Sequence, residues 1–271
     1  SSQRANSRIK HLKNPPPEST VIERRTIMIP IDAHGVDRPS LETLVGIARE
    51  LDRGLLALVL ENTRLRQVAQ LPFTTEVVLA GAGERNLQPE DVGAESSGTR
   101  YIRQTLADLA KQSRVSVDFE SAAGEMLDTT MLREGRSDIF LPQRQRLGAL
   151  ATRYAPHRVP RRSLGLVLDG SEDDASVVAT ACAVLSLNGA HDVYLLCADQ
   201  PAPVHLDMLS RGNTRLCIRC NFKATADNIC DLIRQPGYSV KVLPRSALAN
   251  VPPEKLTPAI QAARGQILLV S

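Results

Sequence analysis

Two short apolar segments, each ending in an aspartate and followed by a helical pattern, narrow the choice of fold more than any other part of the sequence. The first covers residues 27–31 and ends at Asp32, and the second covers residues 164–168 and ends at Asp169. The aspartates are 137 positions apart (169 minus 32), and a second apolar segment follows each helical stretch at the same offset. Such β-α-β units build parallel sheets whose faces are covered by helices. The spacing therefore predicts an internal repeat within an α/β fold.

Further apolar runs and helical periodicities fill out both halves of the chain. In the first half they predict helices over residues 40–53, 99–113 and 125–134, and strands over residues 27–31, 55–60, 115–121 and 139–141. In the second half they predict a helix ending near residue 187, helices over residues 225–234 and 253–263, and strands over residues 164–168, 193–197, 216–220, 239–243 and 266–270. A fifth strand of the first half would fall at residues 156–160, but that segment has two prolines and little apolar content.

The length of the chain and the distribution of its charge indicate how it is divided into domains and a tail. With 271 residues, it has room for two units of about 100 to 150 residues each. We predict one over residues 26–155 and another over residues 163–271, preceded by a flexible basic tail over residues 1–25. The tail has six basic and two acidic residues, which gives +4, so the rest carries −1 of the net +3. A nearly neutral body without tryptophan does not favour nucleic-acid binding.

The sequence predicts a cytoplasmic localisation for the chain. No run approaches the roughly 18 apolar residues that a membrane span needs, and no early apolar run is typical of a signal peptide. Five cysteines favour reduced, buried thiols over a disulfide framework. Cys217 and Cys220 have the spacing of half a zinc site, but strand alternation places them on opposite faces, which does not suit a shared metal.

The candidate ligand site lies where the two repeated strands end. Open α/β sheets bind ligands at the carboxyl edge of their strands, and Asp32 and Asp169 occupy that edge. Gly170 and Ser171 follow Asp169 and complete a short turn into the next helix. Two interpretations stay open for this turn. It contacts a ligand, or Ser171 caps the helix while Asp169 braces the loop.

These residues resemble those of the universal stress protein family. Residues 166–172, with the helix and the strand that follow, are similar to the opening of a universal stress protein domain, and residues 137–148 are similar to its fourth strand and the loop behind it. The resemblance spans residues 26–271 as a tandem pair. It implies two doubly wound parallel-sheet domains, Rossmann-like and of the adenine nucleotide α-hydrolase type, packed as an internal pseudo-dimer, and a role in the stress response.

The resemblance also bears on assembly and on ATP. The family's fifth strand commonly pairs domains, so its loss from the first half would leave an unpaired edge at residues 266–270 and favour a homodimer. ATP-binding members hold phosphate with a glycine-rich loop, because only glycine lets backbone amides close on it. None of the corresponding positions is glycine; they are Pro142, Gln145, Ala155 and Pro156 in the first half and Pro244, Ala247, Thr257 and Pro258 in the second.

Three functions follow as hypotheses. The first is a stress-related, non-catalytic regulatory or binding protein with no cofactor, which fits the lack of a nucleophile elbow or a phosphate-binding Gly-Lys-Ser/Thr loop. The second is an adenine-nucleotide-binding protein or weak nucleotide hydrolase that uses Asp32 or Asp169, with Arg144 and Arg146 replacing the lost amides at the phosphates of ATP or another adenine nucleotide. The third makes the basic tail a tether to an acidic partner or an anionic surface.

Overall fold

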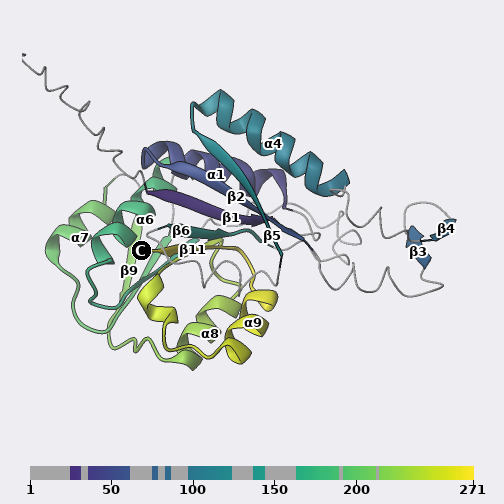
Figure 1. Cartoon of the computed structure of the whole chain (residues 1–271). Coiled ribbons are helices and arrows are strands. Elements are labelled where there is room, and N and C mark those ends of the chain that lie inside the picture. Colours follow the sequence, from purple (N-terminus) through teal and green to yellow (C-terminus); the bar gives the residue numbers. More distant parts are fainter. Residues whose placement is uncertain are drawn as a thin grey trace, which may run out of the picture.

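The computed structural model describes residues 25–31, 36–61, 75–78, 83–86, 97–123, 137–143, 163–188, 192–211 and 214–271 (Figure 1). Several predicted features lie outside these residues. They are the tail up to residue 24, Asp32, the helix over residues 125–134, Arg144 and Arg146, and the proline-rich segment at residues 156–160.

The first half alternates strands and helices as its apolar pattern predicts. Its elements are β1 (Thr26–Ile31), α1 (Arg38–Glu50), β2 (Gly54–Glu61), α4 (Ser97–Ser113), β5 (Val117–Ala123) and β6 (Asp138–Leu141). Between β2 and α4, the long polar connection contains an antiparallel pair, β3 (Thr75–Val78) with β4 (Gly83–Asn86). The N-terminus of α1 is set by Asp37, whose carboxylate accepts the Ser40 amide at 3.2 Å, and by a proline in the first turn.

Among the described residues, the second half repeats this plan and contributes five strands to the main sheet, one more than the first half. Its elements are β7 (Ser163–Leu168), α6 (Asp174–Asn188), β8 (Asp192–Cys197), α7 (Pro203–Leu209), β9 (Arg215–Arg219), α8 (Ala226–Arg234), β10 (Val240–Pro244), the 3-10 helix η2 (Arg245–Leu248), α9 (Pro253–Ala262) and β11 (Gln266–Val270). The first strands of the halves start 137 residues apart (163 minus 26), which is the predicted offset. The helix α7 has only seven residues and was not predicted from the sequence.

All strands except the β3–β4 pair join one sheet of nine strands in the order β5-β2-β1-β6-β11-β10-β7-β8-β9. Neighbours within each half run parallel, and the halves meet where β6 and β11 pair antiparallel, Leu141 with Ile267 and Ile139 with Leu269. The chain is therefore an α/β protein built on one mostly parallel sheet. The strand β11 lies at the centre. From it, the strands of the first half follow outward on one side as β6, β1, β2 and β5, and those of the second half follow on the other side in the equivalent order β10, β7, β8 and β9.

This pairing corrects one expectation. Residues 266–270 were expected to present a free apolar edge to a second copy of the chain. Instead, β10 covers one edge of β11 and β6 covers the other, and Ile267, Leu268, Leu269 and Val270 are buried. The prediction of a free edge failed because the antiparallel partner comes from the other half of the same chain, which a strand pattern read along the sequence does not show.

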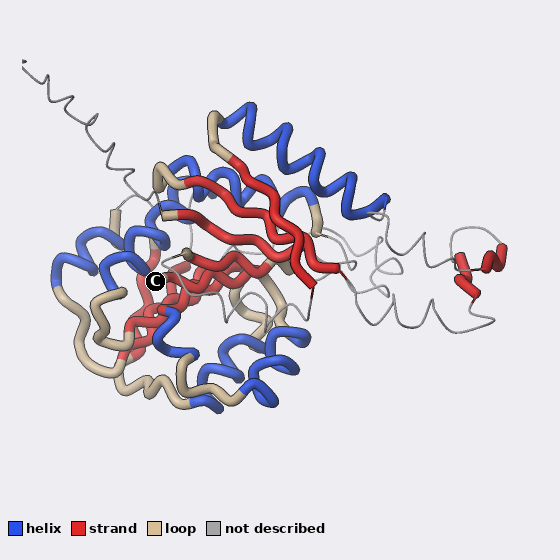
Figure 2. The backbone as a smooth tube through the Cα atoms, viewed as in Figure 1, coloured by secondary structure: helices blue, strands red, loops and turns tan. Residues whose placement is uncertain are grey.

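Helices cover the sheet on two sides, as Figures 1 and 2 show. On one face, α1, α4, α6 and α7 pack over an apolar layer that runs through both halves, from Ile27 and Ile29 to Leu166 and Val193. On the other face, α8, α9 and η2 cover the second half over Val167, Leu196 and Leu269. Successive residues of a strand thus pack into opposite layers, because their side chains point alternately to the two faces of the sheet. Among the described residues, no helix is long and apolar enough to cross a bilayer.

Candidate functional site

Asp169, Gly170 and Ser171, three of the predicted site residues, form the turn between β7 and α6. The Asp169 carboxylate accepts the Ser171 amide at 3.1 Å, and the Ser171 hydroxyl accepts the Asp173 amide at 3.4 Å. Asp174, the first residue of α6, folds back so that its carboxylate accepts the amides of Asp169 (3.3 Å) and Gly170 (3.2 Å). The Ser171 hydroxyl therefore caps the turn that leads into α6, and the amides of Asp169, Gly170, Ser171 and Asp173 are bonded to side chains of this segment.

Ser246, in η2, joins this turn from the neighbouring strand. Its hydroxyl donates to the Asp169 carboxylate at 2.7 Å and lies 3.5 Å from the Ser171 hydroxyl. Because β7 and β10 are adjacent and parallel, their carboxyl ends meet at one edge of the sheet. Sequence reasoning missed Ser246, which lies 77 residues from Asp169 in a segment without a motif.

The two carboxyl groups of the turn differ in proton affinity. Burial favours the neutral form of Asp169, but the hydrogen bonds from Ser171 and Ser246 outweigh it, and the net effect lowers the pKa of Asp169. Burial and the nearby charge of Asp169 both raise the pKa of Asp174. With Glu172 and Asp173 beside them, these groups make the turn acidic. The carboxylates of the turn repel phosphate.

The segment after β10 holds the positions, from Pro244 on, at which the sequence resemblance would place a glycine-rich loop. Here it begins as η2, whose Ala247 and Leu248 are buried in the second apolar layer. The Ala249 amide donates to the Ser246 carbonyl at 3.1 Å, so the segment uses its own donors. Two further loop positions, Thr257 and Pro258, fall inside α9. This segment is a helical turn followed by a helix rather than an open cradle.

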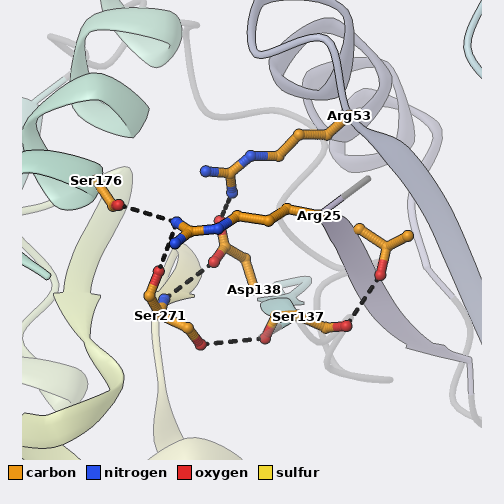
Figure 3. Close-up of polar contacts among 7 residues, drawn as sticks. Arg25, Arg53, Ser137, Asp138, Ser176 and Ser271 are labelled. Atoms are coloured by element: carbon orange, nitrogen blue, oxygen red, sulfur yellow. Dashed lines mark hydrogen bonds and ion pairs between the residues drawn. The ribbon is translucent and has the colours of Figure 1, made fainter. Parts of the chain in front are cut away.

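A second polar cluster, which sequence reasoning also missed, lies where the two halves meet (Figure 3). Its centre is Asp138, a fully buried residue at the start of β6 that forms an ion pair with Arg53. The other Asp138 oxygen accepts the Ser271 amide at 3.0 Å, just beyond β11. Arg25 donates to the Ser176 hydroxyl in α6 and to the Ser271 carbonyl, both at 3.2 Å.

Burial and the charge of Arg25 together lower the pKa of Arg53. A buried carboxylate needs a charged partner and hydrogen bonding to offset its lost hydration, and Asp138 has the Arg53 charge on one oxygen and the Ser271 amide on the other. The cluster connects the starts of β1, β2 and β6 in the first half with the end of β11 and the start of α6 in the second. Its contacts are internal to the fold, which favours a structural clamp. An aspartate opening an apolar strand was the only signal in the sequence.

Of the predicted site residues, the structure thus assembles three, Asp169, Gly170 and Ser171, while Asp32, Arg144 and Arg146 lie outside the described residues. Within the described part of the chain, no group of three or more histidine, cysteine or acidic side chains could hold a metal ion.

Comparison with known proteins returned matches among solved structures alone. Neither a protein-family model nor a curated protein matches the chain. A universal stress protein from Archaeoglobus fulgidus DSM 4304 is 7% identical with a TM-score of 0.42, and covers 90% of this chain and 96% of its own. A protein of unknown function from Pseudomonas aeruginosa PAO1 is 10% identical with a TM-score of 0.43, and the coverage is 92% of each chain. A putative universal stress protein from Pseudomonas aeruginosa UCBPP-PA14 is 11% identical with a TM-score of 0.41, at 92% and 93% coverage.

Proposed function

We propose that this chain is a stress-related, non-catalytic regulatory or binding protein of universal-stress-protein type that does not hold ATP in the manner of the family's ATP-binding members. The observation that carries the proposal is the closed turn at the carboxyl edge of β7. Asp169 is engaged by the Ser171 amide and the Ser246 hydroxyl, and the neighbouring segment after β10 is packed as η2.

Phosphate binding at the carboxyl edge of a parallel sheet has three requirements, and the second half of the chain does not meet them. Phosphate needs unpaired backbone donors, but the amides of Asp169 and Gly170 donate to Asp174. Phosphate also needs a backbone that can approach it closely and donate amide hydrogens. Pro244, the last residue of β10, has no amide hydrogen to donate. Phosphate needs a positive or neutral field, but Asp169 and Asp174 bring carboxylates into the turn. These three features support a role that does not involve phosphate binding by a glycine-rich loop at this edge.

The test is thermal and urea unfolding of the purified chain with and without millimolar ATP, ADP, AMP and cyclic nucleotides, together with analysis of a denaturing extract for copurified nucleotide. We expect no change in unfolding and an empty extract. A nucleotide at about a hundred times its Kd would raise the free energy of unfolding by roughly 2.7 kcal/mol, and that result would overturn the proposal.

Variants then separate the two nucleotide sites that remain as hypotheses. If stabilisation appears and is lost in Asp169→Asn, the ligand binds at the turn after β7. If it is lost in the charge-reversal variant Arg144→Glu/Arg146→Glu and kept in Asp169→Asn, the arginines hold the phosphates, as the alternative hypothesis requires.

Self-association and the basic tail remain predictions. Since β6 and β10 occupy both edges of β11, a homodimer would need another contact, and β5 and β9 stand at the two ends of the nine-stranded sheet. Size-exclusion chromatography with light scattering at micromolar concentration tests the dimer. Deletion of residues 1–25 tests the tail as a tether to an acidic partner, which would be weak and sensitive to salt.

A further inference from the structure

Two cysteines lie side by side where β8 and β9 end. The parallel register pairs Leu196 with Arg219, so Cys197 and Cys220 follow at the next position of each strand. Their sulfur atoms are 3.9 Å apart. The chain beyond β9 is held against the end of β8, because the Asn221 amide donates to the Ala198 carbonyl at 3.1 Å and the Phe222 amide to the Cys197 carbonyl at 2.9 Å.

The two thiols differ in access to solvent. Cys220 is exposed, whereas Cys197 is 2% exposed. Burial, the contact with Cys220 and the charges of Asp199 and Asp174 raise the pKa of Cys197 to about 11, so this thiol stays protonated and poorly reactive alone. An exposed thiol meets an oxidant in solution first, and a buried neighbour within reach can then resolve the oxidised form.

The other cysteines have different surroundings. The Cys182 thiol lies 3.6 Å from the Met208 carbonyl, and the buried Cys230 thiol lies 3.7 Å from the Lys255 carbonyl. Cys217 lies three residues before Cys220 in β9, and its cross-strand partner is Tyr194. Among the described cysteines, the sulfur–sulfur contact that the structure shows is the one between Cys197 and Cys220.

We propose that Cys197 and Cys220 form a reversible disulfide when the protein meets a two-electron oxidant of the hydroperoxide class. In the first step, the Cys220 thiolate attacks one oxygen of hydrogen peroxide, the O–O bond breaks, and the leaving hydroxide takes a proton to become water. Cys220 is thereby oxidised by two electrons to the sulfenic acid. In the second step, the Cys197 sulfur attacks the Cys220 sulfur, the S–O bond breaks, and the leaving hydroxide takes the Cys197 proton as a second water.

The geometry requires a modest movement. A disulfide needs its sulfur atoms about 2.0 Å apart, so the pair must close by roughly 2 Å, which rotation of the exposed Cys220 side chain can supply. The new bond would fasten the end of β9, an outer strand of the sheet, to β8. This inference concerns the thiols alone and does not depend on the proposed function.

The test treats the reduced, full-length protein with hydrogen peroxide, blocks remaining thiols with iodoacetamide, and digests it with trypsin and an endoproteinase that cleaves before aspartate. These cuts place Cys197 on residues 192–198, Cys217 on residues 216–219 and Cys220 on residues 220–223. The expected product is the peptide pair 192–198 and 220–223 at their summed mass less two hydrogens. Dithiothreitol must return both peptides as free thiols.

Variants make the result specific. Cys217→Ser removes a neighbouring thiol that the proposal does not use, so the cross-link should persist unchanged. Cys220→Ser should abolish the cross-link and leave Cys197 fully alkylated once the protein is denatured. Cross-linking of residues 216–219 in place of 220–223, oxidation of Cys220 to the sulfinic acid with Cys197 still free, or a disulfide found only between two chains would each overturn the proposal.

Discussion

Lys241 shows how a single residue can set the pH response of the fold. It is the second residue of β10, is fully buried, and its Nζ atom donates to the Arg264 carbonyl at 2.5 Å. Burial lowers the pKa of Lys241 to about 8, because the charged ammonium loses its hydration. In the unfolded chain the pKa returns to about 10.4.

The free energy of unfolding should therefore rise with pH between about 8 and 10.4, where the unfolded chain binds a proton that the folded chain does not. Below about pH 8 both states are protonated, and this dependence vanishes. The full gain is about 3 kcal/mol. Urea unfolding of the wild type and Lys241→Met at several pH values isolates it, because the other groups that titrate are common to both. Parallel stability curves would contradict this account.

The site residues that could be predicted are those marked by the sequence immediately around them. Asp169 was predicted because an apolar strand ends there, and Ser171 because serine is favoured at helix starts. Ser246 and Asp138 were not, because what defines them is a partner distant in sequence. Ser246 meets Asp169 across 77 positions, and Asp138 meets Ser271 across 133.

Among the elements, the turn before β11 is the most constrained. Gly265 has a φ of +94°, and a Cβ atom there would lie 2.5 Å from the Tyr238 carbonyl oxygen and 2.7 Å from that of Ser239. The next amide, of Gln266, donates to the same Ser239 carbonyl at 2.9 Å. The close approach fixes the position of β11 beside β10, and only glycine fits it.

Gly170 offers a matched comparison, since its φ is +82° but a Cβ atom would meet nothing within 4 Å. Gly170→Ala should cost about 1 to 2 kcal/mol of stability, from backbone strain alone. Gly265→Ala should cost a further 1 to 3 kcal/mol or so, because the backbone must also move apart. The midpoints of urea unfolding measure both losses. Equal losses would show that the contact at Gly265 is relieved without cost.

The order of elements was largely predictable, and their ends less so. Residues 266–270 were predicted as a strand with the bounds that β11 has, because an apolar run follows a turn. The helix predicted over residues 40–53 ends at Glu50 instead, where the chain turns through Asp52 with a φ of 49°. A single aspartate in a left-handed conformation gives no periodic signal.

For the whole molecule, the joint between β6 and β11 decides whether the halves unfold together. Asp138 stands at this joint, paired with Arg53 from the first half and bonded to Ser271 from the second. This pairing could not be foreseen from the sequence, because Leu141 and Ile267 are 126 residues apart (267 minus 141). Which strands of different halves become neighbours depends on packing of the complete chain.

Replacing Asp138 by asparagine should cost about 3 to 5 kcal/mol, because the Arg53 charge stays buried without its partner. Glu42→Gln is the control. It breaks the exposed Arg38–Glu42 pair, whose side chains are 63% and 50% exposed, and should cost less than about 1 kcal/mol. Urea unfolding followed by circular dichroism measures both variants. Similar losses would mean that the cluster in Figure 3 is not a clamp.

The central position of β11 also limits how such a chain could arise by duplication. Each side of the sheet contributes a set of four strands, and β11 fills the single place between them. Two identical copies of the second half would bring two such strands to the junction, where the described part of this chain has one. Among the described strands, the first half therefore relies on β11 of the second half to cover the outer side of β6.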